Sequence, residues 1–260
     1  MTTMMGLGIM IPFFGTMLGA GFVFFLKDQI KPWVNTVLAG FASGVMMAAA
    51  VWSLLIPAME MSEGMGKLSF VPAAVGFALG IVFLLCMDKV VPHIHIESGQ
   101  QEGVKAKLKK TTMLVFAVTL HNLPEGMAVG IVFAGLGTEM SGITIAGAMA
   151  LAFGIALQNI PEGAIISLPL KGEGMSKTKA FLYATLSGIV EPIGALITIL
   201  LTAYITPLIP YTLAFAAGAM VYVIIEELVP ESATSGHSDK GTIGFMIGFI
   251  IMMIMDVALG

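Results

Sequence analysis

Two six-residue strings, at 121–126 and 158–163, are near copies of each other, and both lie inside long apolar stretches. The first reads His-Asn-Leu-Pro-Glu-Gly and the second reads Gln-Asn-Ile-Pro-Glu-Gly. A charged side chain near the centre of a bilayer costs about 2.5 to 3.5 kcal/mol on insertion scales, so a chain keeps one there only with a compensating partner. Two matching carboxylates beside metal-binding side chains indicate that this partner is a metal cation.

The spacing within the strings predicts a shared site. His121 and Glu125 are four residues apart, which places both on one face of a helix, and Gln158 and Glu162 repeat this spacing. Two facing helices can therefore supply four ligand groups to one point. A structural hydrogen-bonded pair is the alternative for a single His-xxx-Glu pair, and the near duplicate argues against it.

A proline in each string frees one backbone carbonyl, at Leu120 and at Leu157, and bends the helix there. Exposed backbone at membrane depth is tolerated where it lines a polar cavity. Because the two helices run in opposite directions, the repeat is inverted, and we expect a binding site at the midplane. Glu191, followed by Pro192 and far from any basic residue, is expected to join this site.

Three buried glutamates without an intramembrane lysine or arginine leave a divalent cation, a shared proton or both as the compensating charge. Imidazole nitrogen and carboxylate and amide oxygens, without thiolate, suit zinc and neighbouring first-row metals better than Cu(I), and the imidazole disfavours magnesium and calcium. Asn122 and Asn159 are explained equally well by metal binding and by hydrogen bonding between helices.

The composition favours an integral membrane protein. The chain has 260 residues, of which 57% are hydrophobic and 11% are charged, which excludes a disordered chain. The single cysteine, Cys86, excludes an internal disulfide and zinc sites built on two or more cysteines. The net charge of −4 argues against nucleic acid as a partner.

Charges, prolines and glycine-rich breaks divide the chain into eight apolar segments, each long enough to cross a bilayer as a helix. We predict an all-α membrane protein with one transmembrane domain over residues 1–260 and a cytoplasmic loop at 92–111. The predicted helices span 4–26, 34–57, 68–91, 112–134, 142–168, 180–202, 208–228 and 242–258.

The lysines set the expected orientation. The chain has no arginine, and eleven of its twelve lysines fall on one side of an eight-helix arrangement, with Lys67 on the other. Cytoplasmic loops collect positive charge, so both termini are expected outside. Five predicted helices also carry a Gly-xxx-Gly pair, which lets helix backbones approach closely and favours a compact carrier over an open channel. These pairs begin at Gly15, Gly40, Gly76, Gly126 and Gly244.

On these motifs, the chain resembles the ZIP family of divalent metal transporters, most closely its bacterial GufA-like branch. The resemblance rests on the strings at 121–126 and 158–163 and on Glu191-Pro192, and it spans nearly the whole chain. It implies inverted repeats of helices one to three and six to eight around the fourth and fifth helices. It also implies a homodimer in the bacterial cytoplasmic (inner) membrane.

The resemblance further implies a ligand set. The primary metal ligands would be His121, Glu125, Gln158, Glu162 and Glu191, with Met46 completing the site. Asn122 and Asn159 would border a second metal position, so one or two ions are expected. Many family members have histidine where this chain has Gln158, and some have a carboxylate where it has Asn159, which argues against strict zinc selectivity.

A pathway on both sides of the site is implied in the same way. Its residues would be Glu60 and Asp256 toward the outside, and Ser53, Glu226, Glu227, His93 and His95 toward the inside. Ordinary solvated helix ends are the alternative for the acidic residues, and a hydrated loop is the alternative for the two histidines.

Three functions compete. The leading hypothesis is uptake of Zn²⁺ and related ions such as Cd²⁺, Fe²⁺, Mn²⁺ or Co²⁺ into the cytoplasm by alternating access of elevator type, with the metal as substrate and no catalytic cofactor. An intramembrane metal-dependent hydrolase is the alternative, but His-xxx-Glu differs from the His-Glu-xx-His of zinc proteases. A proton- or sodium-coupled carrier of an organic solute would leave His121 and Gln158 unexplained.

Overall fold

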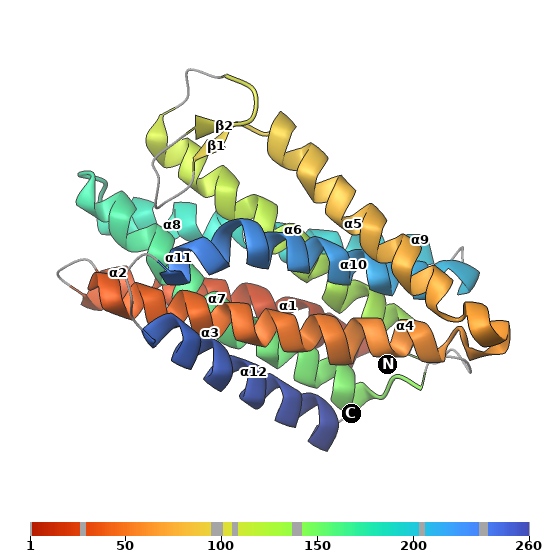
Figure 1. The fold of residues 1–260 in the computed structure, drawn as a ribbon. Helices are drawn as coiled ribbons and strands as arrows, with labels where there is room; N and C mark the ends of the chain where they lie inside the picture. Colours follow the sequence, from red (N-terminus) through yellow and green to blue (C-terminus); the bar gives the residue numbers. More distant parts are fainter. Residues whose placement is uncertain are drawn as a thin grey trace.

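The computed structural model describes residues 2–26, 30–94, 101–105, 109–136, 142–202, 206–233 and 239–259. These residues form a helical bundle, with eight helices long and apolar enough to cross a membrane (Figure 1). The candidate spans are Thr3–Phe25, Pro32–Glu60, Phe70–Val90, Thr111–Gly135, Ile145–Gly172, Lys177–Thr202, Ile209–Ala233 and Lys240–Leu259. The prediction of an all-α protein with eight spans is confirmed.

Several spans are built from more than one element, and a short two-stranded hairpin pairs His93 with Glu102. In chain order the elements are α1 (Thr2–Ala20), α2 (Phe22–Phe25), α3 (Pro32–Ala49), η1 (Ala50–Leu55), α4 (Ile56–Glu60), η2 (Glu63–Leu68), α5 (Phe70–Val90), β1 (His93–Ile94), β2 (Gln101–Glu102), α6 (Lys110–Gly135), α7 (Ile145–Gly172), α8 (Lys177–Ser187), α9 (Val190–Thr202), η3 (Thr206–Leu208), α10 (Ile209–Val223), η4 (Ile224–Leu228), α11 (Val229–Ala233) and α12 (Lys240–Leu259).

Three spans continue past the predicted end by more than one residue, and one of them is the fifth, which reaches Gly172. The second span runs through Pro57 to Glu60, and the seventh runs through Pro230 to Ala233. A π-helical turn precedes each proline, η1 in the second span and η4 in the seventh. Proline lacks an N–H and clashes with the carbonyl four residues earlier, and a local π adjustment accommodates both defects without ending the helix.

Glycines pack four pairs of helices against each other through their backbones. A Cβ added at any glycine of the five predicted pairs would lie 1.9 to 2.5 Å from a backbone oxygen of the facing helix, closer than real Cβ atoms come. The glycines of α1 face α7, those of α3 and α12 face each other, those of α5 face α10, and those of α6 face α9. The expectation of close helix contacts is met.

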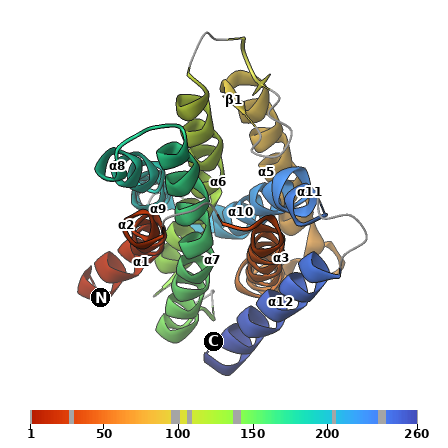
Figure 2. The same cartoon turned by 90° about the vertical axis from the view of Figure 1, so that its left-hand side faces the viewer.

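These pairs assemble into two groups that lie side by side (Figure 2). The first, called here the site-bearing group, contains α1, α6, α7, α8 and α9. The second, the flanking group, contains α3, η1, α4, α5, α10, η4, α11 and α12. All four glycine-packed pairs lie within one group or the other, two in each, so close backbone contacts join the helices of each pair inside its group.

The two ends of the bundle differ in charge. The helix ends beside Lys31, Lys89, Lys109, Lys171 and Lys240 lie together, and we call this the lysine-rich end. The hairpin of β1 and β2 lies at this end, and both chain termini lie toward the other (Figure 1). Which end faces the cytoplasm stays a prediction.

Candidate metal site

The two repeated strings lie in the middle of α6 and α7, which contact each other. Asn122 and Glu125 on α6, and Gln158 and Asn159 on α7, have 0% of their surface exposed. The three-residue spacing of Asn122 and Glu125 keeps both on one face of α6, and Gln158 and Asn159 are adjacent on α7. These four residues lie in the interior of the site-bearing group, whereas His121 and Glu162 are half-buried.

Glu191 reaches the same place from a third helix. The sixth span is broken at Gly188 and Ile189, between α8 and α9, and Glu191 stands in the first turn of α9. Pro192 explains the break, because it cannot donate a hydrogen bond to the carbonyl of Gly188. Glu191 is fully buried and accepts a hydrogen bond of 2.8 Å from the Thr16 hydroxyl on α1.

The three side-chain amides of the strings all use their nitrogen to donate a hydrogen bond within the protein. Gln158 Nε2 donates to Glu125 Oε1 at 2.6 Å. Asn122 Nδ2 donates to the Ser187 carbonyl at 3.3 Å, and Asn159 Nδ2 donates to the Pro12 carbonyl at 3.4 Å. Each amide thus directs its nitrogen to a protein acceptor and leaves its oxygen available for another partner.

Six buried oxygens in this region have no hydrogen-bond partner among the described residues. They are Asn122 Oδ1, Glu125 Oε2, Gln158 Oε1, Asn159 Oδ1, Glu162 Oε2 and Glu191 Oε2. A buried acceptor left without a donor costs about 1 to 3 kcal/mol, and more when it is charged. A bound cation is one partner that can satisfy buried acceptors of this kind.

The three glutamates also lie within electrostatic range of one another. Glu125 interacts with Glu162 and with Glu191, and Asn159 lies beside both Glu125 and Glu191. No lysine or arginine occurs in 112–170 or in 180–226, the segments that carry these residues. No lysine or arginine within these two segments therefore compensates the negative charge.

His121 lies toward the lysine-rich end of this group and faces a different partner. Its Nε2 contacts Glu227 Oε1 on η4, in the flanking group. Glu162 interacts electrostatically with both of these residues. A cavity of about 30 Å³ between the two groups is lined by His121, Glu162, Glu227 and Glu231. His121 thus connects the carboxylate site to acidic residues nearer the lysine-rich end.

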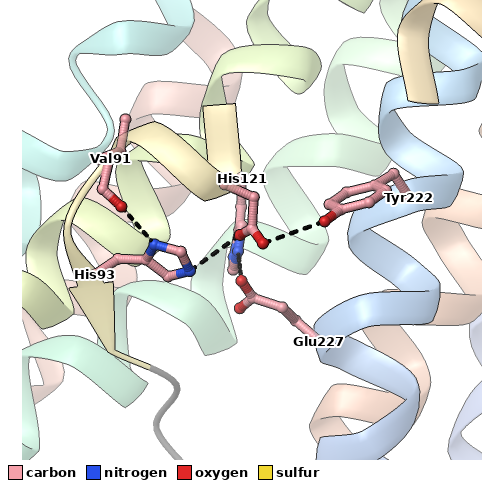
Figure 3. A network of polar contacts seen from close by, with 6 residues as sticks. Val91, His93, His121, Tyr222 and Glu227 are labelled. Atoms are coloured by element: carbon pink, nitrogen blue, oxygen red, sulfur yellow. Dashed lines mark hydrogen bonds and ion pairs between the residues drawn. The ribbon is translucent and has the colours of Figure 1, made fainter. Parts of the chain in front are cut away.

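A second cluster of ligand-type side chains surrounds Glu227. Asp88, His93 and Glu227 each place one ligand atom within 4.8 Å of the others. His93 Nε2 lies 3.0 Å from Asp88 Oδ1, and the Tyr222 hydroxyl donates to Asp88 Oδ2 at 3.2 Å. His93 Nδ1 is 2.8 Å from the Val91 carbonyl (Figure 3). His93 therefore connects the hairpin at the lysine-rich end to α5, through its contact with Asp88.

The charge of His93 follows from these contacts. Burial alone lowers the pKa of His93, but the hydrogen bonds to Asp88 and to the Val91 carbonyl and the nearby negative charges outweigh it, and the pKa rises to about 9. These contacts of protonated His93 stabilise the folded protein. Their contribution is fully present below the unfolded pKa of 6.5 and is lost as the pH rises through about 9. His93 is thus protonated at neutral pH in the absence of metal.

A larger cavity of about 290 Å³ opens toward the other end of the bundle. Its lining includes Ser53, Glu60 and Asp256 from the flanking group and Thr144 from the site-bearing group. The Ser53 hydroxyl donates to Asp256 Oδ1 at 2.6 Å. The three residues predicted from the family pattern for this pathway therefore share one cavity, although the sequence placed Ser53 toward the inside.

The remaining predicted residues are placed as follows. Met46 is fully buried on α3, in the flanking group. Glu226 on η4 is exposed, whereas its neighbour Glu227 contacts His121. His95 lies outside the described residues.

Sequence reasoning missed Thr16, the Pro12 carbonyl, Tyr222 and Asp88 as partners of the predicted residues. Asp88 could have been identified from the sequence, because it lies close to His93 in the chain. Thr16 and Tyr222 could not, because hydroxyl side chains are common in membrane helices and the partners of these two are distant in the sequence.

A comparison with known families matches this arrangement. The profile described as ZIP zinc transporter matches residues 97–256, which include both strings and Glu191. Zinc transporter ZIP11 of Xenopus tropicalis is 36% identical over 98% of this chain and 96% of its own length. The chain belongs to the ZIP family.

Two further relatives of this ZIP protein are also named as zinc transporters. Zinc transporter GufA of Myxococcus xanthus is 40% identical over 80% of this chain and 81% of its own length. Zinc transporter ZIPB of Bordetella bronchiseptica is 35% identical over 95% of this chain and 79% of its own length. The ZIP resemblance inferred from the two strings is confirmed. The prediction of a multi-pass membrane protein is also confirmed.

Proposed function

We propose that this ZIP protein carries Zn²⁺ and related divalent transition metals across the membrane. Membership of the ZIP family and relatives named as zinc transporters support metal transport. The observation that carries the proposal further is the set of six buried oxygens, contributed by α6, α7 and α9, that have no hydrogen-bond partner in the described part of the chain. Three of them belong to carboxylates, whose charge a divalent cation would compensate.

The donor set fits zinc without being exclusive to it. Carboxylate oxygens bind zinc at about 2.0 to 2.2 Å, and carboxylate, amide and imidazole ligands also accept Mn²⁺, Fe²⁺, Co²⁺ and Cd²⁺. The primary ligands in this proposal are Glu125, Gln158, Glu162 and Glu191, with His121 and Met46 joining as the ion moves. Asn122 and Asn159 leave room for a second ion beside the first.

The route runs through both cavities. The cavity lined by Ser53, Glu60 and Asp256 is the entrance, where two carboxylates attract cations. Beyond the site, Glu227 contacts His121 and belongs to the cluster with Asp88 and His93, which receives the ion at the exit. Zinc must displace the proton of His93 there, because only the neutral imidazole binds metal.

The division of the helices into two groups supports a transport mechanism by alternating access. All the carboxylate and amide ligands belong to the site-bearing group, and Met46 and the acidic residues of both cavities belong mainly to the flanking group. Movement of the site-bearing group as one body would carry the ligands from the entrance to the exit, as in an elevator. The fourth and fifth helices would move together with the first and sixth, to which glycines pack them.

Orientation, location and assembly complete the proposal. The lysine-rich end would face the cytoplasm, with both termini outside and net movement inward. The bacterial inner membrane and a homodimer are retained as proposals from the family resemblance. The metal-dependent hydrolase has no support from the relatives, which are named as transporters.

Zinc entry into sealed vesicles tests the proposal. Purified protein is reconstituted into liposomes that contain a zinc-sensitive dye, and zinc is added outside. We expect saturable entry that depends on protein and is inhibited by Cd²⁺ or Mn²⁺. Zinc entry no faster than in protein-free liposomes, from protein shown to be folded and inserted, would contradict it, and an organic solute carried with protons or sodium would then be sought.

A further inference from the structure

The Thr16 hydroxyl makes an unusual contact for a hydroxyl in a helix. Thr16 lies in α1, is completely buried, and donates to Glu191 Oε1 at 2.8 Å across 175 residues of sequence. Nine other hydroxyls in the described helices instead donate to a carbonyl three or four residues earlier in their own helix, a common pattern for serine and threonine. These are Thr36, Ser43, Thr119, Ser167, Ser187, Thr198, Thr202, Thr212 and Ser232.

The glycines that end the two strings bring Thr16 and Glu191 together. A Cβ at Gly163, on α7, would lie 2.2 Å from the Thr16 carbonyl oxygen, and a Cβ at Gly126, on α6, would lie 2.2 Å from the Glu191 carbonyl oxygen. Only glycine permits backbones to approach this closely. Each string therefore admits one further helix, α1 at Thr16 and α9 at Glu191, and the Thr16 hydrogen bond joins the two.

A third glycine leaves space around this hydrogen bond. A Cβ at Gly188, in the break between α8 and α9, would lie 3.0 Å from Thr16 Cβ and 3.1 Å from Glu191 Oε1. The contact between Thr16 and Glu191 thus depends on small residues on three sides.

Helix α1 also accepts a hydrogen bond from a second residue of the site, Asn159 on α7. The Pro12 carbonyl, one turn before Thr16, accepts from Asn159 Nδ2 at 3.4 Å. This contact leaves Asn159 Oδ1 without a partner among the described residues, just as the Thr16 contact leaves Glu191 Oε2 without one. Two of the six partnerless oxygens are therefore oriented by α1.

We infer that Thr16 is a positioning residue of the metal site and that α1 is the fourth helix on which the site depends. The hydroxyl fixes Glu191 Oε1 and so presents Oε2 alone to the cation. This inference rests on the proposed metal transport and adds a residue that no sequence motif indicates. Outer partners that orient metal ligands typically change metal affinity by about 10- to 100-fold when removed.

Zinc affinity of purified Thr16→Val tests the inference. Valine keeps the branched shape of threonine and removes the donor, so Glu191 loses its anchor. By competition with a zinc chelator, we expect affinity to fall about 10- to 100-fold. We expect Thr16→Ser, which restores the hydroxyl, to recover most of the wild-type affinity.

A matched control is available on α9. Thr198 is buried in the same group, but its hydroxyl donates to the Gly194 carbonyl at 2.8 Å, so Thr198→Val should leave zinc affinity unchanged. If Thr16→Val does not fold, Thr16→Ala is judged by the same criterion. Wild-type affinity in the variant without the hydroxyl, or equal loss in Thr16→Ser, would overturn the inference. A wild-type protein that neither binds nor transports zinc would overturn the proposed function itself.

Discussion

Replacement of Glu191 by glutamine is expected to lower zinc affinity and zinc uptake by more than about 100-fold while leaving the protein folded. Thr16 can still donate to the amide oxygen of the new side chain, so the local geometry is retained. The amide nitrogen then occupies the position of Glu191 Oε2, one of the partnerless oxygens. It presents hydrogen atoms to the cation where the wild type presents lone pairs, and one negative charge is lost.

Thermal unfolding of Glu191→Gln separates a lost ligand from a lost fold. Buried like charges repel, so with metal removed by a chelator the variant should be at least as stable as the wild type. Added zinc should raise the Tm of the wild type but not of the variant, because a ligand stabilises only the state that binds it. Glu173→Gln, at the exposed end of α7, serves as the control and should behave as the wild type. Wild-type uptake by Glu191→Gln would remove Glu191 from the site.

Replacement of Gly126 by alanine is expected to reduce zinc uptake by about 100-fold although no ligand is changed. The new Cβ would lie 2.2 Å from the Glu191 carbonyl oxygen and 2.6 Å from its Cα. Helix α9 must therefore retreat from α6 by about 1 Å to reach van der Waals separation. Since Glu191 is on α9 and Glu125 is on α6, the two carboxylates move apart.

The control for this substitution is Gly6→Ala on α1. Gly6 is exposed, and a Cβ there would meet nothing within 4 Å, so uptake should be unchanged. Uptake by both alanine variants is measured in liposomes at matched protein density. If Gly126→Ala transports zinc like the wild type, the spacing of α6 and α9 is not what sets the site.

Most of the fold could be predicted from local patterns in the sequence. Apolar segments bounded by charges and prolines predicted eight spans, because the length that crosses a bilayer is fixed by its thickness. The boundaries were wrong where a π turn carries the helix through Pro57 and Pro230, since such a turn depends on contacts that the local sequence does not encode. The broken sixth span was likewise missed, although Gly188 and Pro192 mark it.

The candidate site was also proposed from a local signal in the sequence. Glutamates at helical spacing in an apolar stretch are conspicuous, because each carries a large desolvation cost. Thr16 could not be found this way, because a threonine in a membrane helix has no such cost and its role depends on Glu191, distant in the chain. The contact of His121 with Glu227 similarly depends on how the two groups of helices lie against each other.

The most direct test is to locate zinc in crystals of the protein by anomalous diffraction above and below the zinc absorption edge. We predict a zinc peak between α6, α7 and α9, within about 2.0 to 2.2 Å of carboxylate oxygens of Glu125, Glu162 or Glu191, which disappears in Glu191→Gln. Zinc found only elsewhere, for example at Asp88, His93 and Glu227, with none beside the three glutamates, would contradict the proposed site.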